Sequence, residues 1–253
     1  MTNNEMLKDK VCIVTGAGKG IGREVAGLFY GSGAKLALIS RSKDDLESLV
    51  AEKKMSGSRV MISAGDVSDE AAVTAFVRQV IEKFGRIDVL VNNAGIRFRK
   101  SFMDIPSDEW HKVIWTNLGS TYLMCREAGR QMIKQKSGRI INMASVVGTL
   151  GLPDLSAYGA SKGGIISLTK CLALEWAPYN INVNVLAPGF CETSYADNFK
   201  QKKELYQFTL DRTPQKRWGS ARDVANACLF LSSDMSDYVT GEVLSVDGGW
   251  SAW

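Results

Sequence analysis

Short apolar runs rich in β-branched residues recur along this chain and alternate with longer segments whose apolar residues follow helical spacing. Such runs, bounded by glycines, predict buried strands, and the longer segments predict helices. Strands are expected at 11–15, 35–40, 60–63, 87–91, 139–145, 181–186 and 243–246. The alternation predicts an α/β fold with a doubly wound, seven-stranded parallel sheet between helices.

The helical segments have recognisable ends. They are expected at 21–30, 46–55, 70–84, 107–117, 119–136, 158–176 and 223–231. Gly31 and Gly85 are C-terminal signals, Pro178 stops a third helix, and Ser68 suits the N-cap of the helix at 70–84. From about 194 to 219 the alternation lapses into a charged, amphipathic insertion. Since no linker or repeat interrupts the pattern, residues 1–253 are expected to form a single domain.

The composition is ordinary for a soluble globular protein, since 45% of the 253 residues are hydrophobic and 23% are charged. This length suits one α/β domain with a large core. The net charge of +4 is small and dispersed, so no nucleic-acid partner is expected. The apolar segments fall short of a membrane span, and the first residues lack the apolar core of a signal peptide. We therefore expect no membrane association and a cytoplasmic location.

Cysteine and histidine usage argues against a conventional metal site. The five cysteines are scattered singly without zinc or redox spacing, which predicts reduced thiols, mostly in the core. His111 is the single histidine and is expected on a helix surface. Nitrogen and sulfur metal sites are therefore not expected, although a site built only of carboxylates stays open.

Tyr158 and Lys162 stand four residues apart on a predicted helix and so share one face. A lysine charge lowers the pKa of a neighbouring phenol from its usual value near ~10, which makes Tyr158 a candidate general acid or base. Ser145 ends the strand at 139–145 and can donate to a substrate carbonyl oxygen beside that phenol. The alternative is a surface lysine next to a half-buried tyrosine.

A glycine-rich turn joins the strand at 11–15 to the helix that follows. Gly16, Gly18, Gly20 and Gly22 free this turn of side chains, so that backbone N–H groups can approach a pyrophosphate. Counted from Gly16, the sixth position of the turn is Ile21, so the G-x-G-x-x-G fingerprint is absent. A plain glycine-rich turn is the alternative, and the strand before it and the helix after it favour phosphate binding.

The end of the second strand bears on cofactor choice. Enzymes that use NAD tend to place a carboxylate there for the ribose 2′-hydroxyl, whereas this chain has Ser40 and Arg41. Arg41 could bind a 2′-phosphate, with Lys19 reaching it from the glycine turn. NADP(H) is therefore the expected cofactor and NAD(H) the alternative. In the competing interpretation these are solvated loop charges, and Asp44 and Asp45 only favour the next helix's N-terminus.

Four segments stand in the order and spacing of the classical short-chain dehydrogenase/reductase family, which the chain resembles over nearly its whole length. They are TGAGKGIG at 15–22, NNAG at 92–95, TNLGS at 116–120 and SVVGTLGLPDLSAYGASK at 145–162. The resemblance implies a Rossmann-type fold and hydride transfer between a nicotinamide cofactor and a ketone or secondary alcohol. It implies the catalytic residues Asn117, Ser145, Tyr158 and Lys162, with Asn117 in a helix distortion where its carbonyl holds a water that touches Lys162.

The same resemblance implies the contacts of the cofactor, and its glycine version T-G-x-x-x-G-x-G matches this turn. Lys19 and Arg41 match the basic pair of members that prefer NADP. The implied cofactor-binding residues are Gly16, Gly18, Lys19, Gly20, Ile21, Gly22, Ser40, Arg41, Asp66, Val67, Asn93, Ala94, Gly95, Tyr158, Lys162, Pro188, Gly189, Cys191 and Thr193. Cys191 is included for its backbone and not for its thiol. The insertion at about 194–219 corresponds to the family's substrate lid.

The substrate is less clearly marked. Arg97, Arg99 and Lys100 place three positive charges beyond the fourth strand, which would attract an anionic substrate, and Arg97 is the candidate contact beside Ser145 and Tyr158. A solvated basic loop is the alternative. The segments NNAGIRFRKSFMDIPSDEW and RTPQKRWG resemble members of the gluconate 5-dehydrogenase type more than 3-oxoacyl-carrier-protein reductases. A sugar acid is thus the expected substrate.

Other functions stay open at this point. They are a 3-oxoacyl-carrier-protein reductase, a general carbonyl reductase, and a non-catalytic nucleotide-binding regulator. The complete set around Tyr158 disfavours the last, because a binder needs no proton relay. By resemblance we also expect a homotetramer, with a dimer as the alternative, formed through helices that hold Met124, Ala128, Met132 and Leu168 and through the C-terminal strand.

Overall fold

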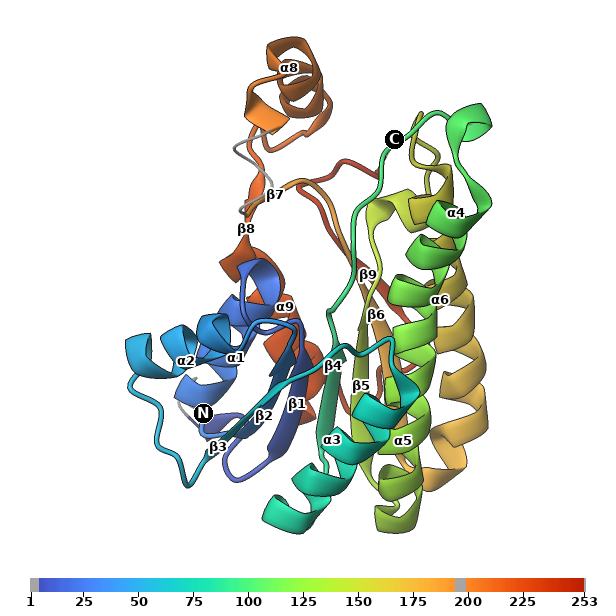
Figure 1. The fold of residues 1–253 in the computed structure, drawn as a ribbon. Helices are drawn as coiled ribbons and strands as arrows, with labels where there is room; N and C mark the ends of the chain where they lie inside the picture. Colours follow the sequence, from blue (N-terminus) through green and yellow to red (C-terminus); the bar gives the residue numbers. More distant parts are fainter. Residues whose placement is uncertain (1–4, 194–198, 253) are drawn as a thin grey trace.

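A parallel sheet forms the centre of the molecule (Figure 1). The computed structural model describes residues 5–193 and 199–252. The sheet has seven strands in the order β3-β2-β1-β4-β5-β6-β9, and all neighbouring pairs are parallel. The strands are β1 (Val11–Thr15), β2 (Lys35–Ser40), β3 (Val60–Ala64), β4 (Val89–Asn92), β5 (Gly138–Met143), β6 (Ile181–Pro188) and β9 (Val243–Val246). The predicted doubly wound sheet is confirmed.

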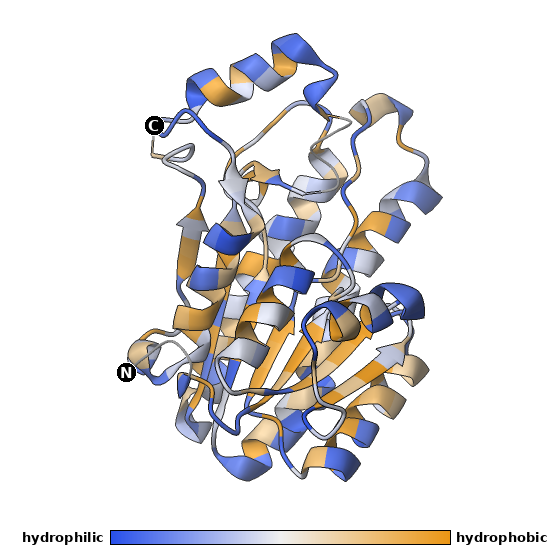
Figure 2. Ribbon diagram, turned by 90° about the vertical axis from the view of Figure 1, so that its left-hand side faces the viewer, coloured by the Kyte–Doolittle hydropathy of each residue, from blue (hydrophilic) through white to orange (hydrophobic). Residues whose placement is uncertain are grey.

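Helices cover both faces of the sheet, as the alternation predicted. On one face lie α1 (Gly20–Gly31), α2 (Lys43–Glu52) and α9 (Ala221–Ser232). On the other lie α3 (Glu70–Phe84), α5 (Ser120–Gln135) and α6 (Ser156–Trp176), with α4 (Ser107–Ile114) leading into α5 through a π-helical turn at Trp115–Gly119. The apolar strands lie inside and polar residues colour the outer helix faces (Figure 2).

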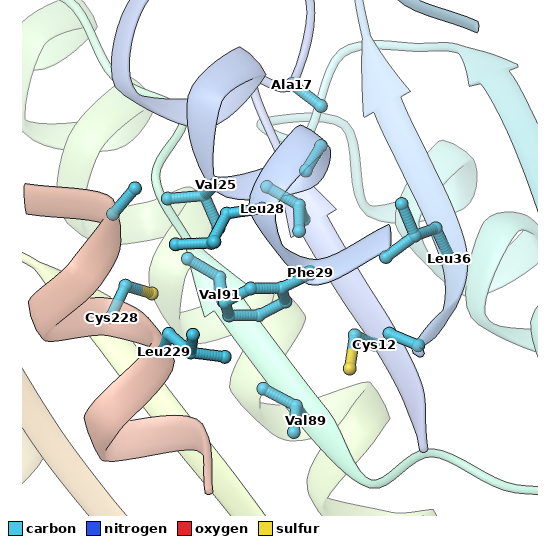
Figure 3. Close-up of a cluster of buried hydrophobic side chains, with 14 of the residues drawn as sticks. Cys12, Ala17, Val25, Leu28, Phe29, Leu36, Val89, Val91, Cys228 and Leu229 are labelled. Atoms are coloured by element: carbon cyan, nitrogen blue, oxygen red, sulfur yellow. The ribbon is translucent and has the colours of Figure 1, made fainter. Parts of the chain in front are cut away.

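Tightly packed apolar side chains join each helix layer to the sheet. In the first layer, Phe29 of α1 is fully buried between Val89 and Val91 of β4 and Leu229 of α9 (Figure 3). Burying a side chain of this size contributes about 1.5–3 kcal/mol relative to leaving it exposed. The cores on the two faces therefore hold the strand ends, and with them the residues that follow each strand, in fixed positions.

Local capping differs from the sequence prediction at the starts of two helices. Helix α2 begins at Lys43 and not at 46, because the Ser42 hydroxyl oxygen accepts from the Asp45 N–H at 3.2 Å. For α3, the N-cap is Asp69, whose carboxylate accepts from two backbone N–H groups, and not Ser68. The prediction that Ser68 is the cap was therefore wrong, since the Ser68 hydroxyl donates to the Asp66 carboxylate instead.

The face of α5 that was expected to meet another subunit lies in the core. Met124, Ala128 and Met132 are each 0% exposed and pack in the layer between α5 and the sheet. That expectation was wrong, because the apolar stripe of α5 is the one it presents to its own sheet. Tyr122 and Leu174 are the large apolar side chains that α5 and α6 expose, at 42% and 80%. The homotetramer itself stays a prediction.

Part of the expected lid lies within the described residues, and 194–198 lie outside them. Helix α8 (Lys203–Arg212) stands away from the sheet, and the short pair β7 (Cys191–Glu192) and β8 (Gly219–Ser220) joins the lid to the body (Figure 1). Phe199 and Trp218 are buried together with Phe190 against them.

Cysteine and histidine positions follow the sequence analysis in most respects. Cys12, Cys125 and Cys228 are buried free thiols, whereas Cys171 is exposed. His111 is exposed on α4. Within 5–193 and 199–252, three or more metal-ligating side chains do not gather anywhere. Over the same ranges, every helix is too short or too polar to cross a membrane.

Candidate active site

A cavity of about 710 Å³ opens at the carboxyl ends of the strands. It lies beside the neighbouring strands β1 and β4, between which the strand order of the sheet reverses. In doubly wound sheets this switch point is where ligands bind. The lining includes these predicted cofactor residues: Gly16, Lys19, Gly20, Ile21, Ser40, Arg41, Asp66, Val67, Asn93, Ala94, Gly95 and Thr193. The structure thus brings together residues from five separate stretches of the chain.

The glycine turn forms a backbone-only side of this cavity. Gly16 has a φ of +63°, a left-handed backbone conformation that residues with a side chain rarely adopt. A methyl group at Gly22 would lie 2.4 Å from the Gly16 carbonyl oxygen. Asn93 fixes the turn by donating from Nδ2 to the carbonyl oxygens of Thr15 and Gly16, at 3.0 and 3.3 Å. With no acidic residue in the first turn of α1, the helix N-terminus suits a pyrophosphate.

Substituting Gly22 by Ala is expected to lower thermal stability and weaken NAD(P)H binding at least about tenfold, because the methyl group must push the Gly16 carbonyl out of the turn. Thermal unfolding and NADPH fluorescence titration measure the two effects. Gly31→Ala, on the same helix where nothing lies within 4 Å, is the control and should leave binding unchanged. Equal binding by Gly22→Ala and the wild type would contradict this account of the turn.

Asp66 and Val67 lie where the exit loop of β3 reaches the cavity. The Asp66 carboxylate accepts from the Ser68 N–H and hydroxyl, at 2.9 and 2.7 Å. These bonds, with the nearby Arg41 charge, hold the pKa of Asp66 below its usual value. The carboxylate is therefore an ionised acceptor, which suits an adenine amino group.

Lys19, Ser40 and Arg41 line one end of the cavity. Ser40 and Arg41 stand at the end of β2, where enzymes that use NAD tend to have a carboxylate for the ribose. The Lys19 ammonium lies 3.2 Å from the Asp45 carboxylate. Asp45 also lines the cavity, so it does more than favour the start of α2. The contact between Lys19 and Asp45 was not predicted from the sequence. The acidic residue four positions after Arg41 could have indicated it.

Lys162 is buried in α6, with 4% exposure, and its Nζ donates to the Met143 carbonyl oxygen at 2.7 Å. Its ammonium lies 5.7 Å from the centre of the Tyr158 ring, so the predicted pairing is observed. Burial lowers the pKa of Lys162 to about 8. The ammonium form still dominates near neutral pH, and a positive charge therefore faces the phenol there.

Asn117 lies in the π-helical turn between α4 and α5, so the predicted distortion is present. Its Oδ1 accepts from the Ile96 N–H at 2.7 Å, and its Nδ2 donates to the Ile96 carbonyl and the Ser161 hydroxyl. A methyl group at Gly95 would lie 3.0 Å from Asn117 Oδ1 and 3.6 Å from Lys162 Nζ. The side chain thus anchors the loop after β4 beside Lys162.

The main-chain carbonyl of Asn117 accepts from the hydroxyls of Thr121 and Ser120, at 2.9 and 3.3 Å. The resemblance implied a relay water at this oxygen. A carbonyl oxygen has two lone pairs, so such a water would compete with these two hydroxyls.

A buried polar ladder fixes α6 to the sheet. Asn142 of β5 accepts from Asn92 Nδ2 at 2.8 Å and donates to the Thr169 hydroxyl of α6 at 2.9 Å. All three side chains are buried, so the bonds hold β4, β5 and α6 in register. The helix that carries Tyr158 and Lys162 is positioned by this ladder.

Ser145 follows β5 and is 8% exposed. Its hydroxyl oxygen accepts from the Val147 N–H at 3.2 Å. This bond uses the oxygen as acceptor and leaves the hydroxyl proton for donation to another group.

Of the predicted cofactor residues at the end of β6 and beyond it, Thr193 lines the cavity. Pro188 ends β6, the Gly189 N–H donates to Val246 at 3.1 Å, and Thr193 lies beside Gly20. Burial raises the pKa of Cys191 to about 11. Its thiol is therefore protonated near neutral pH.

The basic loop after β4 differs from the expected anion site. Arg99 pairs with Asp154 at 3.4 Å and Lys100 with Glu109 at 2.6 Å, so two of the three charges already face carboxylates. Arg97 extends to the lid, where its guanidinium lies 5.8 Å from the centre of the Phe190 ring.

Aromatic side chains of the lid surround that contact, and sequence reasoning did not single them out. Phe190 packs against Phe199, Trp218 and Trp250, with ring centres 5.0–5.7 Å apart. Trp250 is 1% exposed, so the C-terminal segment is part of this cluster. The available signal was an aromatic residue in each of the stretches PGF, RWG and GGW.

Known proteins match this chain over almost its whole length. Residues 16–251 match a family model described as enoyl-(acyl carrier protein) reductase. The 3-oxoacyl-(acyl-carrier-protein) reductase FabG of Thermotoga maritima is 41% identical over 96% of this chain and 98% of its own. The 2-dehydro-3-deoxy-D-gluconate 5-dehydrogenase of Dickeya dadantii is 35% identical over 99% of this chain and 98% of its own.

A solved structure has a similar fold. It is a Beutenbergia cavernae protein provisionally assigned as an NAD(P)-dependent gluconate 5-dehydrogenase, with bound NADP at low occupancy. It is 34% identical, covers 98% of both chains and has a TM-score of 0.92.

The fold, the glycine turn and these matches define an oxidoreductase of the dinucleotide-binding α/β class. The chain belongs to the short-chain dehydrogenase/reductase family, whose members bind NAD or NADP and act on alcohol or ketone groups.

Proposed function

We propose that this chain is an NADP(H)-dependent oxidoreductase that interconverts a ketone and a secondary alcohol. The observation that carries the proposal is the position of buried Lys162 beside Tyr158, Asn117 and Gly95, at the edge of the cavity that the glycine turn lines. A structural lysine would gain nothing from burial with a lowered pKa, since burying its charge costs free energy.

Each side chain has a defined part in the reducing direction. Ser145 donates a hydrogen bond to the substrate oxygen, and Tyr158 passes its phenolic proton to that oxygen. Lys162 stabilises the resulting phenolate, which regains a proton from solvent. Asn117 positions the loop at Ile96 beside Lys162. A bound nicotinamide supplies the hydride to the carbonyl carbon.

Cofactor preference for NADP(H) over NAD(H) rests on the charges at one end of the cavity. Lys19 and Arg41 both line it, and neither position 40 nor position 41 offers a carboxylate to a ribose 2′-hydroxyl. The Beutenbergia cavernae relative with bound NADP supports the same preference.

For the substrate, we propose a small keto acid or hydroxy acid, such as a sugar acid, whose carboxylate meets Arg97. The Arg97 guanidinium reaches the lid, where it lies 5.8 Å from the centre of the Phe190 ring. A carrier-bound 3-oxoacyl thioester is the second candidate, because the 3-oxoacyl-(acyl-carrier-protein) reductase of Thermotoga maritima is more similar in sequence than the gluconate-type relative.

Oxidation of NADPH and NADH, followed by absorbance with 5-ketogluconate, acetoacetyl thioester, a diketone and an aromatic ketone, tests the proposal. We expect turnover with the keto acid and NADPH. Arg97→Ala should raise KM for the keto acid about tenfold or more, as expected for a lost charge-assisted hydrogen bond, with a smaller change for the uncharged ketones.

Arg99→Ala is the matched control, because its charge is directed to Asp154, and its KM should stay near that of the wild type. Turnover confined to the thioester would replace the sugar-acid proposal by the second candidate. No turnover across the panel despite tight NADPH binding would contradict catalysis and leave a nucleotide-binding regulator.

A further inference from the structure

Asp45 reaches into the end of the cavity that Lys19, Ser40 and Arg41 line. We propose that Asp45 sets how strongly the chain discriminates between NADP(H) and NAD(H), by opposing the binding of the 2′-phosphate. This inference rests on the proposed NADP(H) preference and gives it a limit: the site is built to favour the phosphate only moderately.

The position of Asp45 is constrained from two sides. Its N–H donates to the Ser42 hydroxyl at 3.2 Å and its carbonyl oxygen accepts from Arg23 Nη1 at 3.0 Å. The same Arg23 nitrogen donates to the Gly18 carbonyl at 3.2 Å, so the first turn of α2 is tied to the glycine turn. The backbone of Asp45 is therefore held beside the glycine turn.

The Asp45 side chain packs closely against the glycine turn. A methyl group at Gly18 would lie 2.8 Å from Asp45 Cβ and 3.1 Å from the Ser40 hydroxyl. The Asp45 carboxylate meets the Lys19 ammonium at 3.2 Å, and the side chain is only 28% exposed. A phosphate held by Lys19 and Arg41 would thus approach a carboxylate of its own sign.

The charges at this end of the cavity decide the direction of the effect. Lys19 and Arg41 attract a phosphate dianion, whereas Asp45 repels it and also engages Lys19. The lysine side chain is 70% exposed, so its pairing with Asp45 is weak and easily exchanged for a ligand. The repulsion is therefore the larger effect, and it opposes the charged 2′-phosphate, whereas a neutral ribose hydroxyl has no net charge to repel.

Calorimetric titration of 2′,5′-ADP and 5′-AMP into the intact protein tests this inference without turnover. Asp45→Asn keeps the size of the side chain and removes its charge. We expect this variant to bind 2′,5′-ADP about fivefold to tenfold more tightly than the wild type, as estimated for one like charge removed beside a phosphate, with 5′-AMP unchanged.

Asp44→Asn is the matched control, since Asp44 is exposed in the same helical turn and does not line the cavity. Unchanged 2′,5′-ADP affinity in Asp45→Asn, or an equal gain in Asp44→Asn, would overturn the inference. If wild-type protein binds 2′,5′-ADP no more tightly than 5′-AMP, the proposed NADP(H) preference is wrong. A gain in Asp45→Asn alone would then still support the role of Asp45.

Discussion

Replacing Tyr158 by Phe is expected to lower kcat by about 100-fold to 10,000-fold, the range that a positioned general acid contributes. The phenylalanine ring keeps its place beside the Lys162 ammonium, so the fold and the cavity should be preserved. Only the proton that the substrate oxygen requires is lost. Steady-state turnover measures the first effect, and NADPH fluorescence titration should show nearly unchanged binding.

Tyr179→Phe is the control for this variant. Tyr179 follows the other end of α6 and is 40% exposed, so loss of its hydroxyl should leave kcat unchanged. Retained turnover in Tyr158→Phe would remove Tyr158 from the reaction. Loss of NADPH binding together with turnover would mean that the substitution damages the cavity and not the proton transfer.

Replacing Lys162 by Met is expected to abolish turnover and to make the protein more stable near neutral pH. The folded chain buries a lysine whose pKa falls from 10.5 to about 8, so the unfolded chain binds more protons between these values. The cost of the buried charge is therefore full below pH ~8 and disappears as the pH rises toward ~10.5. The lost hydrogen bond to Met143 offsets part of the gain.

A net increase of about 1–2 kcal/mol in the free energy of unfolding is expected near pH ~7, shrinking as the pH rises above ~8. Urea unfolding at both ends of this pH range measures it. Lys170→Met, an exposed position of the same helix, should change neither stability nor turnover. A stability gain that does not depend on pH would show that packing, and not charge burial, is responsible.

The strands and the glycine turn could be predicted because their signals are local. A buried parallel strand needs a run of apolar residues, and a turn that passes phosphates needs glycines within a few positions. The pairing of Tyr158 with Lys162 also follows from helical spacing alone. These features need no knowledge of what lies across the fold.

The features that the sequence did not indicate depend on partners far along the chain or on what covers a helix face. Arg99 meets Asp154, 55 residues away, and the pair removes a charge that the basic loop alone suggested. The stripe of Met124 and Met132 is visible in the sequence, but periodicity does not tell whether a sheet or a second subunit covers it. Lys19 and Asp45 lie on separate elements, so the sequence alone did not indicate their contact.

The polar ladder of Asn92, Asn142 and Thr169 has a consequence for dynamics. Because it crosses from two central strands into α6, the helix cannot open locally without leaving buried amide and hydroxyl groups unpaired. Segments with this kind of coupling exchange their amide hydrogens through opening of the whole domain, whereas exposed loops exchange independently. Heat should therefore inactivate this protein in one cooperative step, with the catalytic helix among the last parts to exchange.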